Sequence, residues 1–187
     1  APDPSPDPAA PRVALVVDDH PITHLGCGRL LGELGYGRVL KAMTGAEALA
    51  ALEAEQPSVV VLDIALPDAP GLTLIAPIRA RAPEAMVLVF SMNDQPGFAA
   101  RALAEGAQGF LSKNAAPEEF ATAIRALEAG EYYLSPAVAL ALAEALSSPL
   151  SVLSASASFL LSLLSPLSDS AELSEAADLE ESEPSVL

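Results

Sequence analysis

Three carboxylates, a hydroxyl and an ammonium each follow a short apolar run of this chain. Asp63 ends one run, the adjacent Asp18 and Asp19 follow another, and Ser91 and Lys113 close two later runs. In an open sheet of parallel strands, the carboxyl ends of the strands meet at one edge, so residues distant in sequence become neighbours there. We therefore expect these five side chains to form one polar site.

Crowded carboxylates repel one another, and a bound hard cation or a raised pKa is the usual remedy. Mg²⁺ takes oxygen ligands and favours one or two carboxylates together with a phosphate. Beside Mg²⁺, Asp63 can act as a nucleophile on phosphorus and form an acyl phosphate. Lys113 would then pair with the phosphoryl oxygens, and Ser91 would hydrogen-bond another of them. A single strand-end acid is more often a helix cap or a solvated charge, so the combination carries the prediction.

Two adjacent carboxylates cannot both face a cation with the same geometry. We expect Asp19 to lie nearer the cation and Asp18 to lie partly behind it. His20 and His24 have a spacing that can bind a metal, but no third ligand accompanies them, so a surface or loop role is favoured.

The segments that carry these residues alternate between strand and helix patterns. Strands are expected at 13–17, 38–43, 58–62, 86–90 and 109–111, and helices at 22–34, 44–55, 71–82, 96–105 and 117–129. Thr44 and Glu47 have the spacing of a capping box, and Pro77 should kink or shorten the third helix. The alternation predicts an α/β fold, a doubly wound parallel sheet with helices on both faces, over residues 12–130.

The composition excludes several classes of protein. The formal net charge is −16, and all nine Lys and Arg residues lie within residues 1–125, which argues against a general surface for nucleic acid or anionic membranes. The single cysteine, Cys27, excludes an intramolecular disulfide, and we expect it to be a packed thiol. The chain shows no secretory signal and no apolar run long enough to span a membrane, so we expect a cytoplasmic protein.

Four runs carry a resemblance to a known family: VALVVDDHP (13–21), VVVLDIALPDAPGL (59–72), VLVFSM (87–92) and EGAQGFLSK (105–113). Over residues 12–130 the chain resembles the receiver domain of two-component response regulators, in the NarL/FixJ (LuxR-type) subfamily. The resemblance implies the flavodoxin-like (βα)5 fold and a phosphoacceptor protein that is not an enzyme beyond self-dephosphorylation. Asn114, where many receivers have proline, agrees with this subfamily.

The resemblance also implies a role for each site residue. Asp63 would be the phosphoacceptor, and Asp18, Asp19, Asp63 and the backbone carbonyl of Ala65 would hold Mg²⁺. Lys113 and Ser91 would bind the phosphoryl group. Ser91 and Phe110 would be the pair that reorients on phosphorylation, although an aromatic residue on the last strand is more often plain core. Met92, which is bulkier than the small residue often found there, would narrow access to the acyl phosphate.

The remaining segments differ from this core in composition. Residues 1–11 are a Pro-rich leader of disordered type, and residues 131–148 resemble the linker and connecting helix of the subfamily. Residues 149–187 faintly resemble its helix-turn-helix and are expected to be a small all-α segment. They contain no Lys or Arg, and duplex binding depends on such cations, so the tail as written is not expected to bind DNA. Three interpretations of this tail are open. It is a degenerate output domain, or a low-complexity tail, or a stretch whose sequence does not represent the natural side chains.

Two functions from different classes follow. The first is a response regulator that receives a phosphoryl group from a sensor histidine kinase, forms a homodimer on activation and regulates transcription. The alternative is a receiver whose output is dimerisation or protein interaction without DNA binding. A phosphatase of the haloacid dehalogenase type also uses a strand-end Asp and Mg²⁺, but it needs a second acid two residues later, where this chain has Ala65.

Overall fold

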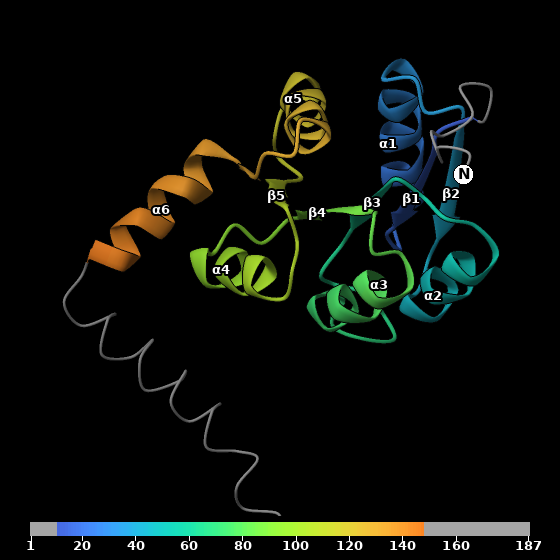
Figure 1. The fold of residues 1–187 in the computed structure, drawn as a ribbon. Coiled ribbons are helices and arrows are strands. Elements are labelled where there is room, and N and C mark those ends of the chain that lie inside the picture. The colour runs from blue at the N-terminus through green and yellow to red at the C-terminus, as the bar shows by residue number, and fades with distance from the viewer. Residues whose placement is uncertain (1–10, 148–187) are drawn as a thin grey trace, which may run out of the picture. The chain divides into compact units, whose positions relative to one another are not determined.

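The computed structural model describes residues 11–147, with side chains through Glu144 (Figure 1). The expected leader, apart from Pro11, and the expected tail at 149–187 lie outside the described residues. The chain divides into two compact units, Ala1–Ala145 and Leu146–Leu187, and the site described below belongs to the first.

Unit one contains a parallel sheet whose strand order is β2-β1-β3-β4-β5-β6. Its described strands are β1 (Val13–Val17), β2 (Arg38–Ala42), β3 (Val59–Leu62), β4 (Met86–Ser91), β5 (Gly109–Ser112) and β6 (Tyr133–Leu134). The helices are α1 (Pro21–Glu33), α2 (Gly45–Ala54), α3 (Ile75–Arg81), α4 (Pro96–Ala104), α5 (Pro117–Glu128) and α6 (Pro136–Ser147), with a 3₁₀ turn, η1, at Gly71–Leu74. The prediction of a doubly wound parallel sheet is confirmed.

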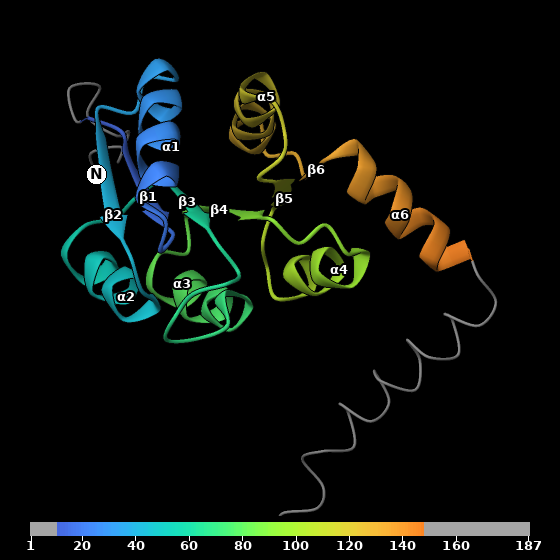
Figure 2. The same cartoon turned by 180° about the vertical axis from the view of Figure 1, so that it is seen from behind.

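Helices cover both faces of the sheet, with α1 and α5 on one face and α2, α3 and α4 on the other (Figures 1 and 2). Successive strand residues point to opposite faces, and β3 shows the result: Val59 and Val61 pack with α1 and α5, whereas Val60 and Leu62 pack with the other helices. A strand buried on both faces reads as a continuous apolar run, as expected of a parallel sheet. These two cores hold the strand ends at fixed positions.

Two elements differ from the expected boundaries. The expected helix at 71–82 is split into η1 and the short α3. Pro77 is the third residue of α3, where its missing N–H removes no bond within the helix, so the helix begins late instead of kinking. A sixth strand, β6, lies in the expected linker, and Leu134 is opposite Phe110 on β5. Within the described residues, no helix combines the length and the apolarity that crossing a membrane would require.

Candidate functional site

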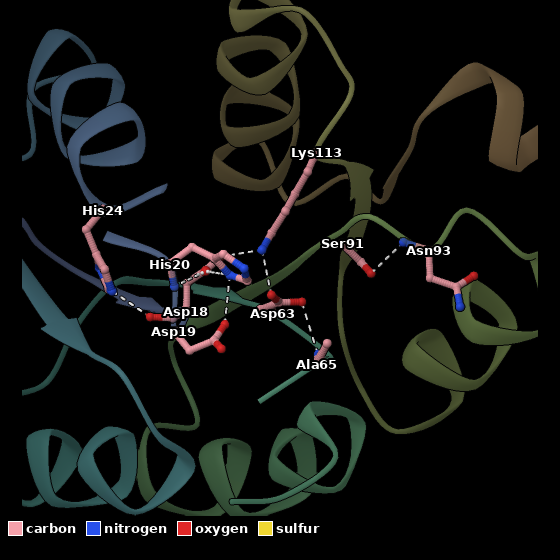
Figure 3. A network of polar contacts seen from close by, with 9 residues as sticks. All are labelled: Asp18, Asp19, His20, His24, Asp63, Ala65, Ser91, Asn93 and Lys113. Carbon is pink, nitrogen blue, oxygen red and sulfur yellow. Dashed lines mark hydrogen bonds and ion pairs between the residues drawn. The ribbon is translucent and has the colours of Figure 1, made fainter. Parts of the chain in front are cut away.

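The expected polar residues meet at the carboxyl ends of the central strands (Figure 3). In the register of the sheet, Val17 is opposite Leu62 and Leu62 is opposite Val89, so β1, β3 and β4 end close together. Asp18 and Asp63 are the next residues along β1 and β3, and both are buried. The expectation that these strand-end residues gather at one edge of the sheet is confirmed.

Lys113 bridges two of the carboxylates. Its Nζ lies 2.6 Å from Asp18 Oδ2 and 2.5 Å from Asp63 Oδ2, and its side chain is 9% exposed. Burial acts to lower the pKa of Lys113, but the hydrogen bonds and the charge attraction from Asp18 and Asp63 together outweigh it and raise that pKa above its usual value. Lys113 is therefore a fixed cation between two acids, a pairing that the sequence patterns did not predict.

The acidic pair after β1 has two different environments. Asp18 Oδ1 accepts a hydrogen bond from the His20 backbone N–H at 2.8 Å and faces His20 Nδ1 at 3.1 Å. Asp19 is partly exposed, and its Oδ1 is buried without a hydrogen bond from any described residue, although His20 Nδ1 lies 2.8 Å away. Asp18 is thus held by a backbone hydrogen bond and by Lys113, whereas Asp19 Oδ1 faces the exposed imidazole of His20.

The donor set fits a hard divalent cation. One ligand atom from each of Asp18, Asp19, His20 and Asp63 can be chosen so that all four lie within 4.8 Å of one another. Three of these residues offer carboxylate oxygens, which Mg²⁺ and Ca²⁺ prefer, and Asp19 Oδ1, a buried acceptor beside His20 Nδ1, is one that a cation would satisfy.

The loop after β3 is held against the phosphoacceptor candidate by several bonds. Asp63 Oδ1 accepts from the Ala65 N–H at 3.1 Å, and the Gly71 N–H donates to the Ile64 carbonyl at 2.9 Å. A Cβ on Gly71 would overlap the Asp63 carbonyl oxygen, so only glycine allows this close approach. Ala65 therefore lies directly beside the Asp63 side chain.

Asp68 anchors the far end of the same loop. Its two carboxylate oxygens accept from the backbone N–H groups of Gly45 and Ala46, at 2.9 and 3.0 Å, at the start of α2. The hydrogen bond from Gly45, and then that from Ala46, lowers the pKa of Asp68. Thr44 caps the same helix by accepting from the Glu47 N–H, as the capping-box spacing predicts.

A pocket of about 250 Å³ opens onto Asp63, and Ser91, Met92 and Lys113 also line it. Ser91 is buried and its Oγ accepts from the Asn93 N–H at 3.0 Å, while Met92 is 63% exposed at the rim. Phe110 lies on β5 with its ring fully buried in the core on the α2, α3 and α4 face. The core position expected of an aromatic residue on this strand is confirmed, and its role in switching remains a prediction.

The two histidines differ from each other. His20 has an exposed side chain in the loop, as expected, but the surface or loop role predicted for His24 is wrong, because this side chain is buried in α1. Its Nε2 lies 2.6 Å from the Asp18 carbonyl oxygen. Cys27 is buried as expected, and burial raises the pKa of its thiol to about 12.

Comparison with known proteins supports the interpretation of this edge. Residues 14–125 match the family model described as the response regulator receiver domain. The transcriptional activator protein ExaE of Pseudomonas putida is 42% identical over 130 residues, which are 69% of this chain and 61% of ExaE. This chain therefore spans less than two thirds of the length of that relative.

Two solved structures are also similar. A LuxR-family two-component response regulator from Aurantimonas sp. SI85-9A1 has a TM-score of 0.67 and 34% identity, with 72% of this chain and 97% of that chain covered. A response regulator from Burkholderia pseudomallei has a TM-score of 0.55 and 31% identity, with 63% and 73% covered. The Burkholderia structure contains a phosphorylated aspartic acid, a calcium ion and citrate.

Proposed function

Since this chain belongs to the response regulator receiver domain family, we propose that Asp63 accepts a phosphoryl group from a sensor histidine kinase. The observation that carries the proposal is the position of Asp63, buried at the end of β3 with Lys113 Nζ 2.5 Å from its Oδ2. A nucleophilic carboxylate beside a fixed ammonium has both the attacking oxygen and a partner for the transferred charge.

In the transfer step, an oxygen of Asp63 forms a P–O bond as the P–N bond of the kinase phosphohistidine breaks. The imidazole nitrogen keeps the electron pair and takes up a proton. Lys113 then has a phosphoryl oxygen to pair with in place of the Asp63 carboxylate, and the Ser91 hydroxyl is available as a donor in the same pocket. Met92 at the rim would limit the access of donors and of water to the acyl phosphate.

Asp18, Asp19, Asp63 and the backbone carbonyl of Ala65 would hold Mg²⁺, with Asp19 nearer to it than Asp18. The carboxylate cluster and the buried Asp19 Oδ1 support this assignment, as does the Burkholderia relative, whose structure contains both a phosphorylated aspartic acid and a calcium ion. Mg²⁺, when bound, supplies positive charge that neutralises the charge developing on the phosphoryl oxygens.

The output that follows is a rearrangement of Ser91 and Phe110, formation of a homodimer and regulation of transcription. Self-dephosphorylation would reset the protein, which is otherwise not an enzyme. The transcriptional role is supported by the regulator relatives. Because sensor kinases draw the phosphoryl group from ATP, this function belongs in the cytoplasm.

A second output, dimerisation without DNA binding, is favoured by one observation: all nine Lys and Arg residues lie in residues 1–125, so residues 126–187 offer no cation to a DNA phosphate. On this proposal the receiver occupies residues 12–130, residues 131–148 connect it onward, and residues 149–187 are a degenerate helix-turn-helix-like or low-complexity helical tail.

Incubation with acetyl phosphate and Mg²⁺, read by intact mass, tests the phosphoacceptor. The wild type should gain the mass of one phosphoryl group and Asp63→Asn should gain none. Asp94→Asn, which removes an exposed acid just beyond β4, is the matched control and should be phosphorylated like the wild type. A wild type without the adduct, or an adduct that survives Asp63→Asn, would contradict the proposal.

The two outputs are separated with the phosphorylated full chain. Gel filtration should show a larger species after phosphorylation for either output, because both include a dimer, so DNA binding is the property that separates them. A gel shift with promoter DNA at several salt concentrations should stay negative if residues 126–187 lack DNA contacts, and a salt-dependent shift would contradict the second output.

A further inference from the structure

His24 is a buried imidazole bonded to the backbone of the acidic site (Figure 3). It lies in the first turns of α1, is 3% exposed, and places Nε2 2.6 Å from the carbonyl oxygen of Asp18. A carbonyl oxygen can only accept, so Nε2 carries the proton and donates it. The other ring nitrogen, Nδ1, is buried without a hydrogen-bond partner among the described residues. The side chain therefore makes one directed hydrogen bond.

That bond acts on the one backbone group of Asp18 that the sheet does not hold. The Asp18 N–H continues the pairing of β1 with β2 by donating to the Ala42 carbonyl at 3.0 Å. Both carboxylate oxygens of Asp18 are also held, Oδ1 by the His20 N–H and Oδ2 by Lys113. The Asp18 carbonyl points to α1 instead, and His24 is the residue that meets it there.

The carbonyl of Asp18 belongs to the same peptide plane as the N and Cα of Asp19. Because a peptide unit is rigid and planar, fixing the Asp18 oxygen also fixes the direction in which Asp19 leaves β1. The Asp19 Oδ1 contacts His20 Nδ1 at 2.8 Å, but that imidazole is 63% exposed and so restrains the carboxylate only weakly. The geometry of Asp19 is thus set mainly through its backbone.

We propose that His24 is a positioning residue for the cation site: its Nε2–H holds the Asp18–Asp19 peptide so that the Asp19 carboxylate faces Asp63. The proposal rests on the proposed function, because it takes Asp18, Asp19 and Asp63 as the cation ligands. Without the His24 donor, the Asp18 carbonyl is a buried acceptor with no partner, and the loop turns to satisfy it.

The test measures binding of Mn²⁺ alone to the full chain, by the loss of the free Mn²⁺ signal in electron paramagnetic resonance, with Mg²⁺ as competitor. His24→Leu should weaken Mn²⁺ binding about tenfold, the scale of residues that orient metal ligands. His24→Gln places an amide N–H near the position of Nε2 and should bind within about twofold of the wild type. Cys27→Ala is the matched control, because Cys27 is equally buried one turn further along α1; it should bind as the wild type does.

A second measurement needs no metal. Amide hydrogen exchange of the metal-free protein should be faster at Asp19 and His20 in His24→Leu than in the wild type, and unchanged in Cys27→Ala. If His24→Leu does not fold, His24→Asn replaces it, because the shorter asparagine side chain cannot bring its amide to the Asp18 carbonyl oxygen. Weaker Mn²⁺ binding by His24→Asn than by His24→Gln supports the proposal, and equal Mn²⁺ binding by the two variants overturns it.

The outcomes separate the two proposals. A wild type that binds no Mn²⁺ contradicts the proposed cation site, whereas amide exchange still reports on the His24 bond. If the wild type binds Mn²⁺, two results overturn the positioning role alone. In the first, His24→Leu binds Mn²⁺ as tightly as the wild type; in the second, His24→Gln binds Mn²⁺ as weakly as His24→Leu.

Discussion

Replacement of Gly71 by alanine tests the close packing behind Asp63. The added Cβ would overlap the Asp63 carbonyl oxygen and lie 2.6 Å from the Ile64 Cα. Both are backbone atoms, so no side-chain rotation relieves the overlap, and the loop itself must move. Overpacking of this kind costs about 1–3 kcal/mol. The movement also weakens the hydrogen bond from Gly71 to the Ile64 carbonyl, which contributes about 1 kcal/mol. We expect Gly71→Ala to lower the free energy of unfolding by about 2–4 kcal/mol.

Gly32→Ala is the matched control, because it makes the same chemical change where a Cβ meets no atom within 4 Å. Gly32 lies within α1, where alanine favours the helix, so this variant should gain about 0.5–1 kcal/mol. Urea unfolding followed by circular dichroism measures both free energies. A Gly71→Ala protein as stable as the wild type, or a Gly32→Ala protein that loses as much, would refute the reasoning.

Three further predictions concern titratable side chains. Asp68 has a lowered pKa in the folded protein because it accepts from Gly45 and Ala46, so its stabilising effect is complete above the ordinary Asp pKa of about 3.9 and is lost as the pH falls below it. Asp68→Asn should therefore have a lower Tm than the wild type at pH 7 and the same Tm near pH 2. Thr44→Ala removes an uncharged cap of the same helix, so its decrease in Tm should not depend on pH. Burial raises the pKa of the Cys27 thiol to about 12, so iodoacetamide at pH 8 should alkylate it more than about a thousandfold more slowly than in urea; equal rates would contradict its burial. Burial, and then the hydrogen bond to Glu128, raises the pKa of Tyr36 to about 12. A spectrophotometric titration compares the wild type with Tyr36→Phe, and the tyrosinate absorbance missing from the variant should be the part that appears near pH 12. If the missing absorbance instead appears near pH 10, the hydrogen bond from Tyr36 to Glu128 would be contradicted.

The strands and the edge they share were predictable because their signals are local. Each apolar run is long enough for one buried strand, and the residue that follows it lies at the carboxyl edge whatever the details of packing. Asp18, Asp63 and Lys113 therefore came together as expected. The pattern does not say which charge pairs with which, because the distance from Lys113 to each acid depends on the exit direction of three separate loops.

The features that sequence reasoning missed depend on partners that leave no pattern. His24 bonds to a backbone carbonyl, and every residue offers the same group, so nothing near it in the sequence marks the contact. Asp68 reaches Gly45, which is 23 residues away, from an exposed loop. Strand β6 has two residues and forms because it pairs with the free edge of β5. This tertiary pairing overrides the weak preference of the two residues themselves for a strand. The late start of α3, at Ile75 two residues before Pro77, is the exception, since the proline itself gave the signal.

The Lys113 bridge also has a consequence for electroneutrality. Three carboxylates against one ammonium leave two negative charges at this edge of the sheet, which equals the charge of one divalent cation. Lys113 lets the fold form without that cation, because the two buried acids already share a counter-ion. Under the proposed function, conversion of the Asp63 carboxylate to an acyl phosphate dianion would add one negative charge to a site that a bound divalent cation had balanced. The phosphorylated state would then be the unbalanced one, with the excess charge within reach of the ammonium that had been neutralising Asp63.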